Sequence, residues 1–275
     1  MQSFTLQRLL PVMLAAAVPF LYAADDSPKK LSVEQMEEFL KVAKITKIKD
    51  LATGVTNSRR ASLADGSIEH DAHVQSIDEA KAVFQGDRGT EMNFRDSWKF
   101  NVAAYRLACI LGIGDMVPPS VERSVTGNTS AVTWWIDNSM MEVDRRKKHL
   151  EAPDMDSWNR EMYVVRVFDQ LIYNTDRNLQ NLLIDSDFHI WMIDHTRAFR
   201  MQTTLKEKKD LVRCDRTLLA NLRKLKAEDL QPLKRYITDA EIKGIFARRD
   251  KIVEFFDQQV VEKGESAVLY DRPAR

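Results

Sequence analysis

The sequence predicts an α+β protein with two lobes, a small one built on an antiparallel β-sheet with one helix, and a larger, mainly helical one. Short apolar runs separated by turn residues such as Gly54 and Asp65-Gly66 indicate hairpin strands in the first half. Apolar residues three and four positions apart indicate helices in the second half. A third observation is a tight hairpin pattern between two of these helices, at residues 182–193.

Length and charge restrict the classes of protein to consider. The chain has 275 residues, of which 44% are hydrophobic, so we expect one two-lobed domain rather than several domains. Lys plus Arg and Asp plus Glu both number 41, so no net field attracts nucleic acid, and no nucleic-acid partner is expected. Cys109 and Cys214 can form at most one disulfide, and the sequence does not show whether they meet. We interpret both as structural thiols.

Residues 1–24 have the layout of a signal peptide. Arg8 precedes an almost wholly apolar run, Leu9 to Tyr22, and small residues follow it. This run is shorter than the ~20 residues that a membrane-spanning helix needs. We therefore expect cleavage near Ala23 or Ala24, no stable membrane span afterwards, and export to a periplasm, a secretory lumen or the extracellular space. An uncleaved anchor is the alternative.

The small lobe is expected over residues 45–136, after a linker and an N-terminal helix in residues 25–44. Ser32-Val-Glu-Gln35 is a capping sequence for that helix, which we expect to end near Ala43. The predicted elements of the small lobe are strands at 45–53, 59–63 and 68–77, a helix at 97–111, and strands at 120–125 and 131–136.

Residues 137–157 are polar, contain the basic run Arg145–Lys148, and are interpreted as a connecting loop with solvated charges. The helical lobe is expected over residues 158–265. It contains a helix at 158–173, a Lys-rich surface loop at 203–213 and a long final helix opened by the capping box Thr238-Asp-Ala-Glu241, and residues 266–275 form a tail.

The predicted hairpin brings hard oxygen ligands together. Asn181 stands just before its first strand and Asp194 just after its second, so pairing of the strands brings these two residues close. Amide and carboxylate oxygens suit Mg²⁺, which keeps several waters and bridges to substrate phosphates. Asp176 lies five residues before Asn181, near enough to direct a carboxylate at a nucleophile beside the same metal.

At these residues the sequence resembles the lipid- and atypical-kinase branch of the protein-kinase superfamily, which includes phosphatidylinositol 3- and 4-kinases and secretory kinases of the Golgi casein-kinase type. Phe168 to Asn178 is similar to their catalytic-loop region, Asn181 falls at their metal-binding position, and Ile193 to Phe199 looks like their metal-binding Asp motif. The resemblance covers roughly residues 45–260 and implies a two-lobed protein-kinase-like fold.

The resemblance also implies roles for four residues. Asp176 would be the catalytic base or orienter, and Arg177 would support the loop. Asn181 and Asp194 would hold Mg²⁺ or Mn²⁺ together with ATP or another nucleoside triphosphate. Gly54 to Ala61 occupies the place of the turn that covers the phosphates.

The sequence departs from the family at one charged pair. The strand position of the phosphate-pairing Lys appears as Gln75, in Ala72-His-Val-Gln75, and the helix position of its partner Glu appears as Asn101. Two amides can hydrogen-bond to each other, but they supply no cation for the α- and β-phosphates. The substitutes that the sequence offers are Arg59, Arg60 and Lys81, with Glu91 as a displaced carboxylate partner.

Three further residues lie near the predicted site. Trp134 and Trp135 end the strand where the lobes connect, and strand alternation turns one of them inward. Trp135 is our candidate for contact with the nucleotide base, and the other tryptophan is expected in the core. His195, in a polar turn beside Asp194, is expected to be solvated or capped.

The leading hypothesis is a nucleotide- and Mg²⁺-dependent phosphotransferase that acts on an acceptor hydroxyl outside the cytoplasm. One alternative is a pseudokinase-type binding or scaffold protein without turnover, which Gln75 and Asn101 favour. Another is nucleotidyl transfer, which a re-oriented nucleotide would allow. The sequence does not identify the acceptor, which belongs to any of the classes protein, lipid, carbohydrate or small molecule.

Overall fold

The computed structural model describes residues 31–51, 58–86 and 89–273. The expected signal peptide at residues 1–24 and residues 54–57, half of the expected phosphate-covering turn, lie outside these ranges. Within the described part of the chain, no helix is long and apolar enough to cross a membrane.

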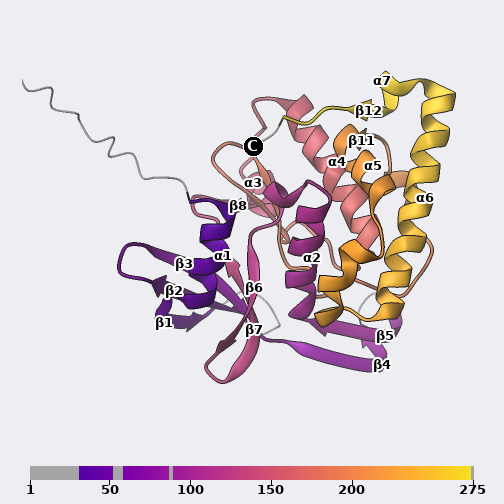
Figure 1. Ribbon diagram of the computed structural model, residues 1–275. Helices are drawn as coiled ribbons and strands as arrows, with labels where there is room; N and C mark the ends of the chain where they lie inside the picture. The colour runs from indigo at the N-terminus through magenta and orange to yellow at the C-terminus, as the bar shows by residue number, and fades with distance from the viewer. Residues whose placement is uncertain (1–30, 52–57, 87–88, 274–275) are drawn as a thin grey trace, which may run out of the picture. The chain divides into compact units, whose positions relative to one another are not determined.

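The small lobe contains a five-stranded antiparallel sheet (Figure 1). Its strand order is β1-β2-β3-β7-β6, so β3 lies at the centre, between β2 on one side and β7 on the other. The expected strands are confirmed, with bounds β1 (Lys44–Asp50), β2 (Arg59–Ala64), β3 (Glu69–Gln75), β6 (Ser120–Val125) and β7 (Asn128–Trp134).

The two faces of this sheet differ in chemistry. One face carries apolar side chains such as Leu63 and Val74, which are buried in one cluster with Phe39 and Leu40 of α1 (Val33–Val42). The expected capping box of α1 is present, because Ser32 accepts from Gln35 N and Gln35 accepts from Ser32 N. The opposite face, here called the inner face, is mainly polar and carries Arg60, Ser62, Asp71, His73, Gln75 and Thr133, together with Ala131 and Trp135.

A hairpin that the sequence analysis did not assign follows β3. It consists of β4 (Asp78–Gly86) and β5 (Gly89–Ser97), here called the inserted hairpin. Every residue of β4 is at least partly exposed, so this strand has no buried stripe that would produce a period-two hydrophobic pattern. The hairpin is held by the stacked rings of Phe84 and Phe94, 4.2 Å apart, and its second strand reaches the first turn of α6 (Figure 1).

Helix α2 (Lys99–Ile110) follows the hairpin and lies between the sheet and the helices (Figure 1). Although it was expected in the small lobe, its apolar side is buried in the larger core, together with residues of α4 and α5 such as Phe168 and Leu219. It also contacts β6 and β7. The helix therefore connects the sheet mechanically to the helical lobe.

The helical lobe has the expected long helices α4 (Met155–Ile172) and α6 (Asp239–Lys263). Between them lies the expected hairpin of β9 (Leu182–Ile184) and β10 (Ile190–Met192). The remaining elements of this lobe are η1 (Gly114–Met116), η2 (Lys208–Asp210), β11 (Cys214–Asp215), α5 (Arg216–Lys224), η3 (Glu228–Arg235), α7 (Glu265–Val268) and β12 (Leu269–Tyr270).

The expected connecting loop at residues 137–157 contains regular structure. A short strand, β8 (Met140–Met141), pairs with β9, and α3 (Glu142–Lys147) follows it. Glu142 is buried and is bound by Arg145 and Arg146 one turn later, at 2.6 and 2.7 Å. Part of the basic run therefore neutralises a buried carboxylate.

The expected tail at residues 266–275 also contains regular structure. Strand β12 pairs in parallel with β11, and Val268, Leu269 and Tyr270 are buried. The Tyr270 hydroxyl donates to the Arg160 carbonyl of α4. Cys109 and Cys214 are both free thiols.

We predict that Thr238→Ala lowers the free energy of unfolding by about 1 kcal/mol, the usual contribution of an N-cap side chain. The expected capping box of α6 is present: Thr238 Oγ1 accepts from Glu241 N, and Glu241 Oε2 accepts from Thr238 N at 2.7 Å. Urea unfolding measures the change, with the exposed Thr203→Ala as a control. Equal losses in the two variants would contradict the capping role.

Candidate catalytic and metal site

The predicted hairpin forms the base of the candidate site. Met192 pairs with Leu182, and Ile193 N donates to the Asn181 carbonyl at 3.2 Å. Asn181 therefore lies beside the residue that precedes Asp194. The strand pairing that the sequence predicts is confirmed, whereas the roles of the two side chains stay predictions.

Arg177 joins the loop before this hairpin to three other parts of the lobe. Its Nε and Nη2 donate to the two carboxylate oxygens of Asp169 on α4, at 2.8 and 3.1 Å. Its Nη1 donates to the Asn181 carbonyl and, at 2.8 Å, to the Ile193 carbonyl, so one nitrogen holds the ends of both strands. Nη2 also donates to His195 Nε2 at 3.1 Å. These contacts fit the predicted supporting role.

The Asn181 side chain is held by the loop that carries Asp176. Its amide nitrogen donates to the Asp176 carbonyl at 2.9 Å, which fixes the amide plane and leaves Oδ1 as the end available to a ligand. Asp176 N in turn donates to Asn174 Oδ1 at 2.9 Å. Asn181 is buried and the Asp176 carboxylate is about one quarter exposed, at 28%.

Asp194 has a left-handed backbone, with φ of 52°. This conformation is uncommon for residues other than Gly, but Asp tolerates it, and it turns the chain sharply out of β10. Thr196 Oγ1 donates to Asp194 Oδ1 at 3.0 Å, which fixes one carboxylate oxygen.

His195 is buried, contrary to the expectation of a solvated side chain. Because Arg177 donates to its Nε2, the neutral ring carries its proton on Nδ1. Burial, with the nearby charge of Arg177, holds the pKa of His195 well below its ordinary value. The His195 backbone N donates to Asn101 Oδ1 at 2.7 Å, so α2 is tied directly to the turn that carries Asp194.

The expected amide pair is not formed. Among the described residues, no hydrogen bond joins Gln75 to Asn101. Asn101 contacts the backbone of His195 instead, and Gln75 Nε2 donates to Ser58 Oγ at 3.1 Å. Asn101 thus contacts the turn that carries Asp194, and its expected place in the nucleotide contact stays a prediction.

Two of the expected cofactor-binding residues lie together on the inner face. The Arg60 guanidinium lies 4.2 Å from the centroid of the Trp135 ring, and Arg60 forms an ion pair with Asp71. Ser62 Oγ donates to the other oxygen of Asp71 at 2.6 Å. Trp134, as alternation predicts, lies on the opposite face, where it contacts Phe39.

The other expected cations are placed elsewhere. Arg59 precedes Arg60 and therefore belongs to the face that covers α1, where it donates to Thr126 Oγ1 at 2.9 Å. Lys81 lies on the exposed strand β4 and pairs with Glu79 at 2.8 Å. Neither contact brings these two residues to Asn181 or Asp194, and their expected phosphate-binding role stays a prediction.

His73 is an inner-face residue whose role the sequence left unassigned. It stands directly opposite Arg60 in the pairing of β2 with β3, two residues before Gln75. Burial lowers the pKa of His73, and the negative charge of Asp194 offsets this only in part. A neutral imidazole therefore lies within electrostatic range of the candidate metal ligand.

The sequence analysis did not single out Arg197 or Asp96. Arg197 Nη2 lies 2.9 Å from Glu91 of the inserted hairpin, and its Nη1 lies 3.8 Å from Asp176 Oδ1. Asp96 is the second-last residue of the same hairpin and is buried, and this burial raises its pKa, with a contribution from the charge of Asp194. Only a knowledge of the hairpin's position would have pointed to these two residues.

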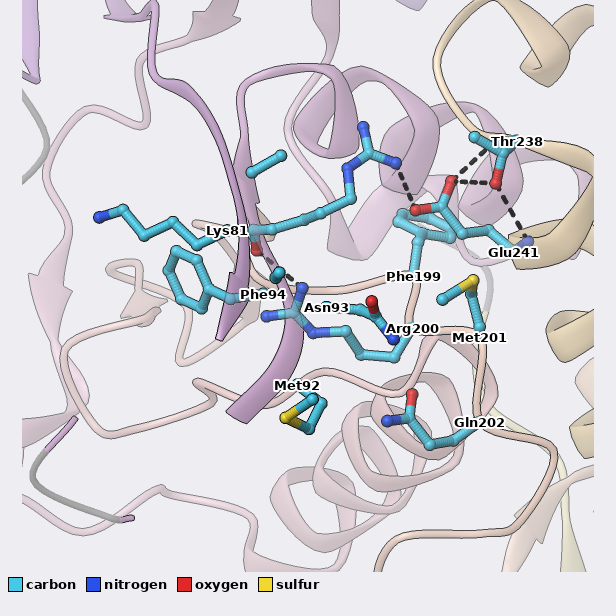
Figure 2. Close-up of a pocket in the computed structure, with 13 residues that line it drawn as sticks. Lys81, Met92, Asn93, Phe94, Phe199, Arg200, Met201, Gln202, Thr238 and Glu241 are labelled. Atoms are coloured by element: carbon cyan, nitrogen blue, oxygen red, sulfur yellow. Dashed lines mark hydrogen bonds and ion pairs between the residues drawn. The ribbon is translucent and has the colours of Figure 1, made fainter. Parts of the chain in front are cut away.

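A pocket of about 340 Å³ lies beside this site (Figure 2). It lies between the inserted hairpin on one side and residues 199–202 with the start of α6 on the other. Its lining includes neither Asp176 nor Asp194. Arg200 links the two regions, because its Nη2 lies 2.6 Å from Glu91 and 3.4 Å from Thr175 Oγ1. The side chains that Figure 2 labels around the pocket are Lys81, Met92, Asn93, Phe94, Phe199, Arg200, Met201, Gln202, Thr238 and Glu241.

The donor set at the hairpin fits a hard divalent cation. Asn181 supplies an amide oxygen and Asp194 a carboxylate, the ligand types that Mg²⁺ and Mn²⁺ accept. Within the described ranges, no group of three or more His, Cys, Asp and Glu side chains could hold a metal by itself. A cation at Asn181 and Asp194 would therefore need further ligands from water and substrate.

The fold is similar to that of a known kinase. No protein-family model matches the chain, and no curated protein sequence matches it significantly. The crystal structure of CtkA, a proinflammatory kinase of Helicobacter pylori, matches 82% of this chain and 98% of that chain, at 10% sequence identity and a TM-score of 0.51. At this identity the likeness shows the fold alone. The two-lobed, kinase-like fold expected from the sequence is thus confirmed.

We predict that His195→Gln makes the stability less sensitive to acid. The pKa of His195 is lower in the folded chain than the ordinary value of about 6.5, so the unfolded chain binds more protons as the pH falls below 6.5. Stability is then lost toward low pH by up to about 1.4 kcal/mol per pH unit for this group.

Urea unfolding at a series of pH values from neutral to mildly acidic measures the slope, which should fall in His195→Gln and stay unchanged when the exposed His149 is replaced in His149→Asn. An unchanged slope in His195→Gln would show that His195 is not the group that titrates.

Proposed function

We propose that this protein is a nucleotide- and divalent-cation-dependent phosphotransferase with an acceptor hydroxyl as its substrate. The observation that carries the proposal is the arrangement of Asp176, Asn181 and Asp194 in a kinase-like fold, where Arg177 holds the ends of both hairpin strands. Because phosphoryl transfer requires chiefly positioning and charge neutralisation, a rigid set of oxygen ligands beside a carboxylate is the machinery it needs.

Asn181 Oδ1 and the Asp194 carboxylate are the proposed ligands of Mg²⁺ or Mn²⁺. A bound cation would neutralise the charge of the phosphates of ATP or another nucleoside triphosphate. The loop hydrogen bond from Asn181 Nδ2 and the Thr196 hydroxyl on Asp194 orient the two ligands in advance. Second contacts of this kind maintain ligand geometry in metal sites.

Asp176 is the proposed base or orienter. It accepts the proton of the acceptor hydroxyl as that oxygen forms a bond to the γ-phosphorus, and the bond from the γ-phosphorus to the β–γ bridging oxygen breaks. Its carboxylate is partly exposed, as contact with an incoming acceptor requires. The acceptor can belong to any class that bears a hydroxyl.

The inner face of the sheet is the proposed contact for the rest of the nucleotide. Trp135, backed by the Arg60 guanidinium, offers an aromatic surface for the base. His73 and Gln75 extend along the same face toward the phosphates. We further propose that the protein acts outside the cytoplasm, because residues 1–24 have the layout of a signal peptide.

One observation favours a second candidate, a nucleotide-binding or scaffold protein without turnover. The inner face of β3 presents His73 and Gln75 where the related kinases are expected to present a Lys, and Arg60 is already paired with Asp71. Nucleotidyl transfer is a third possibility, and the mass added to the acceptor, a phosphoryl group or a nucleoside monophosphate, separates it from phosphotransfer.

We predict that ATP with Mg²⁺ or Mn²⁺ raises the melting temperature of the purified protein, whereas Asp194→Ala abolishes this shift. A ligand at 100 times its dissociation constant stabilises a protein by about 2.7 kcal/mol. Thermal melting with ATP, GTP and ADP, each with and without the cation, measures the effect. The control is Asp187→Ala, which removes an exposed carboxylate from the turn of the same hairpin. A shift that persists in Asp194→Ala would place the nucleotide elsewhere, and no shift from a folded protein would refute the nucleotide site.

We also predict that Asp176→Asn retains the metal-dependent thermal shift but loses transfer by a factor of about 10² to 10⁴, the usual contribution of a general base. Mass spectrometry of the protein and of a panel of acceptors after incubation with ATP and Mg²⁺ measures the transfer. Unmodified acceptors with the parental protein, despite a nucleotide-dependent shift, would favour the binding protein without turnover.

A further inference from the structure

The site contains cations other than the three that the sequence offers as substitutes for the missing Lys. Arg59 and Lys81, two of those three, make their contacts elsewhere, and Arg60 is engaged by Asp71. Glu91, the carboxylate expected to be displaced, does bind cations, but they are Arg197 and Arg200 of the segment after Asp194, at 2.9 and 2.6 Å.

The backbone of Arg197 is fixed between the loop that carries Asp176 and the turn that carries Asp194. Thr175, the neighbour of Asp176, donates to the Arg197 carbonyl through both its N and its Oγ1, at 3.2 and 2.9 Å. Arg197 also follows Asp194 by only three residues. Its side chain therefore starts from a point that is anchored beside both parts of the candidate site.

The inserted hairpin orients the side chain of Arg197. Glu91 accepts from Nη2, and the ring of Phe94 lies with its centroid 4.9 Å from the guanidinium carbon. Phe94 is buried and also contacts the Arg200 guanidinium, at 5.6 Å. A carboxylate and an aromatic ring thus hold the plane of the Arg197 guanidinium, which limits its rotation.

Donors of Arg197 stay available on the side of Asp176. Nη1 lies 3.8 Å from Asp176 Oδ1, which is too long for a hydrogen bond. The Nε atom has no hydrogen-bond partner among the described residues but is buried, so Nη1 is the donor atom that faces an incoming anion beside Asp176. A guanidinium has five N–H donors in a planar fork, so binding to Glu91 leaves donors for an anion.

We infer that Arg197, oriented by Glu91, binds the terminal phosphoryl group of the nucleotide, a position other than the α- and β-phosphates that the missing Lys would contact. The inference rests on the proposed function and deepens it. The cation comes from the segment after Asp194 rather than from β3, and its carboxylate partner comes from the inserted hairpin rather than from α2. Arg197 would act next to Asp176, where the phosphoryl group is transferred to the acceptor and its negative charge needs neutralisation.

The inference requires that Arg197 distinguish a triphosphate from a diphosphate. The test is calorimetry, which measures the dissociation constants for ATP and for ADP, each with Mg²⁺, on the parental protein and on Arg197→Gln. The substitution should weaken ATP binding about tenfold or more, as expected for a lost hydrogen bond to a charged group, and leave ADP binding within about twofold. Arg197→Lys, which keeps the charge but loses the fork, should recover part of the difference. Glu91→Gln, which removes the charge that orients Arg197, should fall between the parental protein and Arg197→Gln.

Arg166→Gln on α4, which removes an exposed cation, is the control and should change neither constant. A melting curve establishes that each variant is folded, and Arg197→Lys and Glu91→Gln carry the comparison if Arg197→Gln does not fold. If Arg197→Gln weakens ATP and ADP equally, or neither, Arg197 has only a structural role. Tighter ATP binding would show instead that Arg197 obstructs the site. In these cases Asp194-dependent binding by the parental protein leaves the proposed function intact, whereas no nucleotide binding by the folded parental protein overturns both.

Discussion

The candidate site depends on the partly buried side chain of Arg177. Two backbone carbonyls, those of Asn181 and Ile193, lie beside the ends of β9 and β10 and are acceptors that need hydrogen-bond donors. Arg177 supplies both from one nitrogen, and its bidentate pair with Asp169 anchors this arrangement to α4. Removal of the guanidinium would leave the Asp169 carboxylate without its cation and take a donor from both carbonyls, so the geometry around the candidate metal ligands is tied to one cation.

Another arginine, Arg248, also donates to backbone carbonyls of separate segments, and it lies farther along the chain, on the final helix. Arg248 of α6 is fully buried and donates to the Leu171 carbonyl at 2.7 Å and to the Arg200 carbonyl at 2.9 Å. It has no acidic partner among these contacts, and burial lowers its pKa to about 10. At neutral pH it is therefore still charged. It binds the end of α4 and the segment after Asp194 to the final helix, which extends the rigid framework of Arg177.

Contacts between distant segments place the small lobe relative to the turn that carries Asp194. Asn101 of α2 accepts from His195 N, and Ser97 N, at the end of the inserted hairpin, donates to the Thr196 carbonyl at 2.9 Å. Arg95 of the same hairpin pairs with Glu241 in the first turn of α6. The inserted hairpin therefore connects the sheet, the segment after Asp194 and the final helix. This is a physical basis for the proposed use of its Glu91 in the site.

Local patterns predicted the five strands of the sheet, the capped helices and the β9–β10 hairpin, because each has a hydrophobic period or a capping sequence of its own. They predicted that Asn181 and Asp194 converge, since strand pairing fixes this. The inserted hairpin was missed because β4 is exposed along its length. The partners of Arg197 and Asn101 could not be predicted, since residues about one hundred positions apart meet only through tertiary packing.

The most direct test of the central claim is electron paramagnetic resonance of Mn²⁺ titrated into the protein, with and without a non-hydrolysable ATP analogue. Two protein ligands, Asn181 and Asp194, are too few to hold the ion tightly alone, so the account predicts weak binding without nucleotide and strong binding with it. Asn181→Leu should remove the nucleotide-dependent part. Strong Mn²⁺ binding without nucleotide, or nucleotide-dependent binding that survives Asn181→Leu, would contradict the account.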